Sequence, residues 1–326
     1  MKIRLVPQSD GQPSVAVRTP QGWLPLRPLL TRRERLASPE LESAAQGVLP
    51  FLQIHKTQGE AIQALIAAAS PDDYLPDPPS LLPVQPRAFR DFMLYEQHYI
   101  NAARGMAQRF LPEKVKMLEL YEKVFKKPHA KLLPKPIWYK KPIYYMGSHI
   151  NFYTDGDKVP WPAYTNALDY ELELGVIVAH PIFNASPDEA REAIGGFVII
   201  NDFSARDVQL PEMGSGFGPV KSKNFANAMS SVVVTADELF PRVDALAVRV
   251  IVNGETWGEG STAGMQFSLG EMVAYASLGE HVVPGEVMAT GTIPGCSGVE
   301  TGHWLSHGDE ITLEIEGIGH LVNVLE

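Results

Sequence analysis

Six prolines fall within residues 71–86 and constrain the backbone there. They are Pro71, Pro76, Pro78, Pro79, Pro83 and Pro86. Proline lacks a backbone N–H and fixes φ, so such a stretch forms neither a helix nor a central strand. We therefore predict a linker over 71–86. It divides the 326-residue chain into a small N-terminal domain over 1–70 and a main domain over 87–326.

Residue patterns on both sides of this linker predict a mainly β chain with some helices, an α+β class. In the first domain, short apolar runs broken by Gly and Pro indicate small strands and turns, followed by a helix over 58–69. In the main domain, we expect an amphipathic surface helix over 113–127, and the spacing leaves open whether it is a lid. Ser186 and Glu189 form a capping box that starts another helix, and Asn253-Gly254 predicts a hairpin.

The composition narrows the classes of partner. The chain has 38 acidic and 28 basic residues, and its net charge of −10 argues against binding to nucleic acid. No apolar run approaches the ~20 residues of a membrane helix, and the N-terminus has no signal-type apolar core. A single cysteine, Cys296, fits a reducing compartment. We expect a cytoplasmic protein with no membrane partner.

Carboxylates at alternating positions mark a candidate metal site. Residues 169–178 read as a strand that enters a core, so Glu171 and Glu173 share one face. Two such carboxylates repel each other unless a cation lies between them, and a divalent cation with oxygen ligands is the usual solution. Spacing alone leaves open the alternative of a solvated strand face.

Two further segments combine apolar strands with chemically active side chains. The buried-strand pattern over 196–200 ends in a polar cluster that contains Asp202 and Arg206, and ends of strands hold such groups rigidly. A helix cap at Asp202 is an alternative explanation. Just after the linker, Asp91 is followed by His98, for which the residue pattern alone favours a structural role.

Taken in order, these motifs resemble those of the fumarylacetoacetate hydrolase family. The resemblance covers roughly residues 87–326. It rests on Asp91 with His98, Glu171-x-Glu173, the segment 201–209, the Lys-x-Phe of 223–225, and Gly291-Thr292. It implies a mixed β-sandwich roll, a homodimer and, in full-length hydrolases, a small N-terminal domain.

The resemblance also implies a divalent cation and its ligands. It assigns the ligand role to four carboxylates: Asp91, Glu171, Glu173 and Asp202. Such a shell leaves positions that a chelating substrate and water complete. We expect Mg²⁺, with Ca²⁺ and Mn²⁺ as alternatives.

Roles for the other site residues come from the same resemblance. It implies that His98 is the general base and that Lys223, with help from Gln209, neutralises oxyanion charge. Lys221 is a rival, and we choose Lys223 because the family lysine precedes a Phe by two positions. Glu300 is the candidate partner of His98, with a surface loop acid as the alternative. Substrate contacts are expected from Tyr145, Arg206, Gln209 and Thr292.

These roles predict an enzyme that hydrolyses C–C bonds in fumarylacetoacetate-like or acylpyruvate β-diketo acids. The metal ion would bind both substrate oxygens and stabilise the enolate, and His98 would activate water. A hydratase, isomerase or decarboxylase of 2-oxo acids is the alternative on the same scaffold, and a non-catalytic ligand-binding protein is a further one. One departure is Asn101, where smaller family members carry a glutamate.

Overall fold

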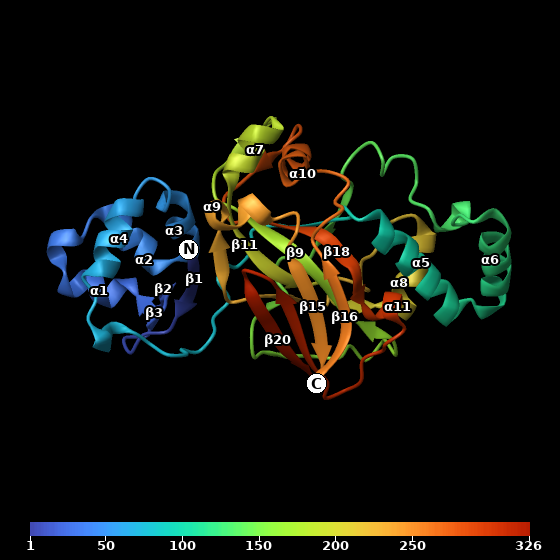
Figure 1. The fold of residues 1–326 in the computed structure, drawn as a ribbon, viewed down its shortest axis with the longest axis horizontal. Helices are drawn as coiled ribbons and strands as arrows, with labels where there is room; N and C mark the ends of the chain where they lie inside the picture. Colours follow the sequence, from blue (N-terminus) through green and yellow to red (C-terminus); the bar gives the residue numbers. More distant parts are fainter.

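A computed structural model describes all residues 1–326 and shows two β-sheets surrounded by helices (Figure 1). The larger sheet has eleven strands in the order β3-β2-β1-β14-β11-β9-β18-β4-β5, and β13 joins β11 to β6. Its strands are β1 (Lys2–Val6), β2 (Ser14–Thr19), β3 (Gly22–Pro25), β4 (Phe89–Phe92), β5 (Tyr144–Gly147), β6 (Phe152–Tyr153), β9 (Glu171–Val178), β11 (Ile194–Asn201), β13 (Asn227–Met229), β14 (Val233–Thr235) and β18 (Val287–Ser297).

A second sheet of five strands has the order β16-β15-β19-β20-β7. Its strands are β7 (Lys158–Val159), β15 (Ala247–Val252), β16 (Glu255–Ser261), β19 (Glu310–Ile315) and β20 (Gly319–Leu325). Two small ladders complete the β structure, with strands β8 (Leu168–Asp169) and β12 (Ser204–Ala205), and β10 (Ile182–Phe183) and β17 (His281–Val282).

In Figure 1 the N-terminal helices lie to the left of the sheets, and the later helices lie above the sheets and to the right. In the N-terminal region these are α1 (Leu26–Arg32), α2 (Pro39–Gln46), α3 (Val48–Ile54) and α4 (Gly59–Ala67). In the rest of the chain they are α5 (Glu96–Phe110), α6 (Pro112–Phe125), α7 (Pro187–Ala193), α8 (Arg206–Ser215), α9 (Ala236–Leu239), α10 (Leu269–Ala276) and α11 (Gly298–Thr301). None of them combines the length and apolar character that crossing a membrane requires.

The central strands β9 and β11 of the large sheet are fully buried, and their side chains alternate between two apolar clusters. On β9, Leu172 and Leu174 belong to the main core of 41 buried residues, which also takes in side chains of the five-stranded sheet. Ile177 points the other way, into a second cluster of 24 buried residues, most of which come from the N-terminal strands and helices. Side chains on β9 with odd numbers, including Glu171 and Glu173, therefore share the face of the second cluster.

The N-terminal region continues the large sheet instead of standing apart from it. Strand β1 pairs antiparallel with β14, which places Ile3 opposite Val233. Within 71–86, Leu75 exchanges backbone hydrogen bonds with Trp23, and Arg4 donates to the carbonyl of Pro78. The proline-rich stretch is thus tied to the N-terminal strands. The division into domains at this stretch stays a prediction.

The structure confirms the expected mixed β roll with helices. The predicted helices over 58–69 and 113–127 correspond to α4 and α6, and the capping box of Ser186 starts α7. The Asn253-Gly254 turn joins β15 to β16. The N-terminal region contains the expected small strands together with more helix than the single one predicted, because α1 to α3 supply the apolar side chains that cover the sheet.

Candidate metal centre and active site

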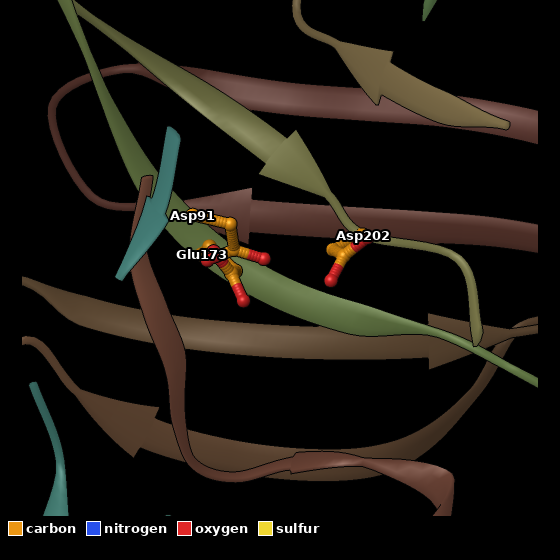
Figure 2. Close-up of side chains that lie close together, drawn as sticks. All are labelled: Asp91, Glu173 and Asp202. Carbon is orange, nitrogen blue, oxygen red and sulfur yellow. The ribbon is translucent and has the colours of Figure 1, made fainter. Parts of the chain in front are cut away.

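Three carboxylates from separate strands meet on the face of the large sheet that the second cluster also covers. Asp91 lies on β4, Glu173 on β9, and Asp202 directly follows β11. Figure 2 shows their carboxylate groups directed toward one space. Each can offer an oxygen such that the three oxygens lie within 4.8 Å of one another, and all three residues are buried. We call these residues the carboxylate triad.

Two oxygens of the triad lack hydrogen-bond partners, which fits a site for a divalent cation. Asp91 Oδ1 and Asp202 Oδ1 are buried and accept no hydrogen bond, although buried carboxylate oxygens are normally satisfied. Hard divalent cations take such oxygens as ligands. The triad therefore supplies oxygen donors that the protein itself does not satisfy.

The electrostatics of the triad agree with this assignment. Burial, together with the carboxylates of Glu173 and Asp202, raises the pKa of Asp91 well above its ordinary value. Burial and the repulsion from Asp202 and Glu171 raise the pKa of Glu173 in the same way. Burial also raises the pKa of Asp202, despite the nearby Lys223. Ionising all three groups is unfavourable without a cation.

Glu171, the fourth predicted ligand, lies next to the triad but is held by two basic side chains. Arg206 Nη2 donates to Glu171 Oε1 at 2.6 Å, and Lys223 Nζ donates to Glu171 Oε2. Burial opposes ionisation of Glu171, yet Arg206 and Lys223 outweigh it and lower the pKa of this carboxyl. Glu171 is not among the residues whose oxygens converge in the triad, so its role as a ligand stays a prediction.

The structure distinguishes the two candidate lysines, Lys221 and Lys223, by their contacts. Lys223 is 3% exposed, and its ammonium group donates to both Glu171 and Asp202. These carboxylates outweigh the effect of burial and raise the pKa of Lys223. Lys221 is exposed, and its Nζ lies 5.7 Å from the ring centre of Tyr164. Of the two lysines, only Lys223 contacts the carboxylates of the site.

His98 joins the site from the first turn of α5 and pairs with Glu300 of α11. His98 Nδ1 lies 2.8 Å from Glu300 Oε2, and His98 Nε2 lies 3.6 Å from Glu171 Oε1. The side chains of His98 and Glu300 are 2% and 1% exposed, which excludes the reading of Glu300 as a surface loop acid. Asn101 Nδ2 donates to Glu300 Oε1 at 3.3 Å, and Ser297 Oγ donates to Oε2 at 2.8 Å.

The predicted substrate contacts surround the same carboxylates. The half-buried Tyr145 on β5 donates its hydroxyl to Asp202 Oδ2 at 2.8 Å. Thr292 on β18 donates to Glu173 Oε1 at 3.3 Å. Gln209 accepts a hydrogen bond from Arg206 Nη1 at 2.9 Å. These side chains are gathered at the site, and their contact with a substrate stays a prediction.

Sequence reasoning missed Asp169, a fully buried carboxylate at the edge of the site. Arg206 Nε donates to Asp169 Oδ2 at 2.8 Å, and the backbone N–H groups of Gly298 and Val299 donate to the same carboxylate at 2.8 and 3.0 Å. Burial raises the pKa of Asp169 despite its pairing with Arg206. The available signal was the strand alternation itself, because Asp169 precedes Glu171 by two positions.

Comparisons with known proteins identify the family of this chain. Residues 120–326 match the family model described as fumarylacetoacetate (FAA) hydrolase C-terminal. A homoprotocatechuate catabolism bifunctional isomerase/decarboxylase of Escherichia coli is 35% identical over 159 residues, which are 48% of this chain and 34% of that protein. The chain thus aligns with only about a third of the length of that relative.

Two solved structures share the fold. A fumarylacetoacetate hydrolase from Exiguobacterium antarcticum has a TM-score of 0.67 at 22% identity, with 100% of this chain and 99% of that chain covered. A fumarylpyruvate hydrolase from Pseudomonas aeruginosa, in complex with Mn²⁺ and pyruvate, has a TM-score of 0.53 at 17% identity, with 76% and 92% covered. Because the family match takes in more than half of the chain, this protein belongs to the fumarylacetoacetate hydrolase family.

Proposed function

We propose that this protein is a divalent-metal-dependent hydrolase that cleaves a C–C bond in acylpyruvate or fumarylacetoacetate-like β-diketo acids. One observation carries the proposal. A buried His98 that is oriented by Glu300 directs its second ring nitrogen toward Glu171, the carboxylate beside the triad. A base and a cation site that adjoin each other suit the attack of water on a polarised carbonyl group.

His98 acts as the general base in this proposal. With Glu300 accepting at Nδ1, the Nδ1–H tautomer is favoured and Nε2 is free to take a proton from water. Such a base typically contributes a factor of about 10²–10⁴ to the rate. Burial of both side chains keeps the pair in one orientation.

The carboxylates of the site hold the cation, and we propose Mg²⁺, with Ca²⁺ and Mn²⁺ as alternatives. Asp91, Glu173 and Asp202 supply the oxygens that converge, and Glu171 is the fourth proposed ligand. When bound, a divalent cation polarises the two carbonyl oxygens of a chelating substrate. The fumarylpyruvate hydrolase of similar fold was solved with Mn²⁺ and pyruvate, which supports a 2-oxo acid as the chelating unit.

The basic and polar side chains complete the proposed reaction. The water oxygen bonds to the carbonyl carbon, the adjacent C–C bond breaks, and the electron pair stays on the leaving carbon, which then takes up a proton. The products are a carboxylic acid and a keto acid, which is the 2-oxo acid pyruvate where the substrate is an acylpyruvate. Lys223 neutralises negative charge on oxygen during this step, with Tyr145 and Gln209 as further hydrogen-bonding groups and Thr292 beside Glu173. Arg206 acts largely through Glu171, since its guanidinium already pairs with carboxylates.

The test is an assay with acetylpyruvate and Mg²⁺ or Mn²⁺, with acetate and pyruvate measured separately. We expect both products in equal amounts and a loss of turnover with chelator. His98→Gln is expected to lower kcat by about 10²–10⁴-fold while the Kd for Mn²⁺ changes little. Wild-type turnover by His98→Gln would remove His98 as the base, and absence of cleavage across a panel of β-diketo acids would exclude the hydrolase.

An isomerase or decarboxylase acting on 2-oxo acids is the second candidate. The observation in its favour is the 35% identity to the bifunctional isomerase/decarboxylase of Escherichia coli. Oxaloacetate separates the two functions. Release of carbon dioxide from oxaloacetate, without cleavage of any β-diketo acid, would replace the hydrolase by this candidate.

We also propose a homodimer in the cytoplasm. The family resemblance supports the dimer, and sedimentation equilibrium at several concentrations tests it. The only cysteine, Cys296, is free and buried, which is compatible with a reducing compartment. Fractionation of the source cells, with immunodetection of the chain, tests the compartment.

A further inference from the structure

We propose that Asp169 is a positioning residue, which fixes α11 so that Glu300 holds His98 in its working orientation. The inference rests on the proposed role of His98 as a base. Asp169 lies on β8, and its side chain contacts neither the triad nor His98 directly in the hydrogen-bond network. Its effect on the reaction must therefore pass through other groups.

The buried carboxylate of Asp169 accepts hydrogen bonds from four donors. Its Oδ2 accepts from Arg206 Nε at 2.8 Å and from the backbone N–H of Val299 at 3.0 Å. Its Oδ1 accepts from the backbone N–H groups of Gly298 and Tyr170 at 2.8 and 2.9 Å. Since the residue is 0% exposed, water cannot replace these partners when one is removed.

Two of these donors belong to the start of α11, the short helix that carries Glu300. Gly298 and Val299 are the first two of its four residues, and Glu300 follows directly. A helix of this length has almost no stability of its own, so its position depends on contacts outside it. Asp169 provides such a contact at the backbone immediately before Glu300.

The approach at Gly298 is too close for a side chain. A Cβ added there would lie 2.4 Å from Asp169 Oδ1 and 2.2 Å from the carbonyl oxygen of His303. The glycine therefore permits the direct contact between the carboxylate and the backbone of α11. This close approach is a second observation that links Asp169 to the position of α11.

A closed chain of contacts connects Asp169 with the residues of the proposed active site. Arg206 joins Asp169 to Glu171, with Nη2 at 2.7 and 2.6 Å from their respective carboxylate oxygens. Glu300 contacts His98 Nδ1 at 2.8 Å, and His98 Nε2 lies 3.6 Å from Glu171 Oε1. Asp169 thus fixes the base from one side through α11 and the neighbouring carboxylate from the other through Arg206.

A double-mutant cycle tests whether Asp169 acts through Glu300. We expect Asp169→Asn to lower kcat by about 10–100-fold with little change in KM, as is typical for groups that orient a reacting side chain. Because the main effect passes through Glu300, Asp169→Asn should cause a much smaller loss in the Glu300→Gln background than in the wild type. Losses that multiply in the double variant would overturn the proposal.

An NMR measurement tests the same connection without any turnover. In protein labelled with ¹⁵N-histidine, the Nδ1 proton of His98 should give a downfield signal typical of a hydrogen bond to a carboxylate. His98→Gln assigns this signal by its absence. We expect Asp169→Asn to shift or abolish it, and this readout stays valid if the assay refutes the proposed hydrolase.

Control variants separate positioning from general damage. Asp155 also accepts two backbone N–H groups, from Ser231 at 2.6 Å and Val322 at 3.1 Å, outside the site. Asp155→Asn should leave kcat and the His98 signal unchanged. If Asp169→Asn does not fold, Gly298→Ala perturbs the same contact, because its added Cβ would meet Asp169 Oδ1, and it should alter the signal in the same way. A folded variant at either position with wild-type kcat and signal refutes the role.

Discussion

Identical side chains in this site have opposite electrostatic roles because their neighbours differ. Glu171 and Glu173 lie two positions apart on β9 and share one face. Arg206 and Lys223 overcome the effect of burial and lower the pKa of Glu171, whereas burial and nearby carboxylates raise that of Glu173. Glu171 is therefore ionised and paired in the metal-free protein, and Glu173 depends on a cation to ionise.

Replacing Asp91 by Asn should separate metal binding from stability. The pKa of Asp91 is raised in the folded state, so the folded protein holds this proton more tightly than the unfolded chain. Ionisation above about pH 4 then costs folding free energy without metal. In EDTA, we expect Asp91→Asn to have a higher Tm than the wild type, by about 2 °C for each kcal/mol of unfolding free energy gained. We also expect Mn²⁺ to raise the Tm of Asp91→Asn much less than that of the wild type.

Differential scanning calorimetry at neutral pH, with and without Mn²⁺, provides the measurement. Asp155→Asn is the control, since Asp155 lies outside the triad and accepts backbone hydrogen bonds. An Asp91→Asn protein that gains as much Tm from Mn²⁺ as the wild type would show that Asp91 is not a ligand.

The two lysines permit a matched test of oxyanion stabilisation. Lys223 contacts Glu171 and Asp202, whereas Lys221 is exposed two positions earlier. We expect Lys223→Met to lower kcat by about 10²–10³-fold, the loss typical of one stabilising donor, and Lys221→Met to leave kcat unchanged. Steady-state kinetics with acetylpyruvate gives both values. A larger loss for Lys221→Met would reverse the assignment.

At this scale the residue pattern indicated which side chains share a face, whereas the pairing of Glu300 with His98 came from the family resemblance. Alternation on a strand places Glu171 and Glu173 on one face without any tertiary information. Spacing did not distinguish Lys221 from Lys223, and resemblance to the family made that choice. Asp169 escaped notice because its partners, the backbone N–H groups of α11, lie about 130 residues away in the chain and leave no side-chain motif.

At the scale of elements, the site depends on how closely β18 approaches the end of β4. Gly291 on β18 has φ +83°, and a Cβ there would lie 2.5 Å from the carbonyl oxygen of Phe92. Its N–H donates to Glu173 Oε2 at 3.2 Å. One residue therefore sets both the strand contact and the orientation of a triad carboxylate.

Gly291→Ala should consequently damage stability and metal affinity together. The added Cβ meets backbone atoms that cannot rotate away, and positive φ is unfavourable for alanine. We expect a loss of about 1–3 kcal/mol in unfolding free energy and a higher Kd for Mn²⁺. Urea unfolding and calorimetric titration measure the two effects. Gly254→Ala is the control, because Gly254 has φ +82° but nothing within 4 Å of its added Cβ. Equal Mn²⁺ affinity in the two variants would show that Gly291 affects the contact between the strands and not the orientation of Glu173.

Elements with local signals were predicted, and those that depend on distant partners were not. The capping box of Ser186 and the Asn253-Gly254 hairpin use residues a few positions apart, which are visible in the sequence. The pairing of β1 with β14 joins positions such as Ile3 and Val233, which no short pattern connects. Helices α1 to α3 gain their stability from packing on the sheet, and this contribution appears only in the folded molecule.

On the scale of the whole molecule, His55 connects the N-terminal region to the main part of the chain. It directly follows α3, is 3% exposed, and its Nε2 lies 3.1 Å from Asp237 Oδ1 of α9. Its Nδ1 lies 2.9 Å from the carbonyl oxygen of Leu52. Burial lowers the pKa of His55, and the two partners offset this effect only in part. Folding therefore favours the neutral imidazole.

Acid should weaken this connection. In the unfolded chain, His55 binds a proton as the pH falls through about 6.5. In the folded protein, His55 stays neutral until a lower pH. The free energy of unfolding therefore decreases as the pH falls over that interval. Replacing His55 by Gln keeps a hydrogen-bonding group but removes the titration. We expect the urea midpoint of His55→Gln to fall less than that of the wild type between about pH 7.5 and 5.5. His180→Gln, at an exposed position, should follow the wild type. Parallel loss in all three proteins would place the acid sensitivity elsewhere, because only a buried histidine that folds neutral gives this difference.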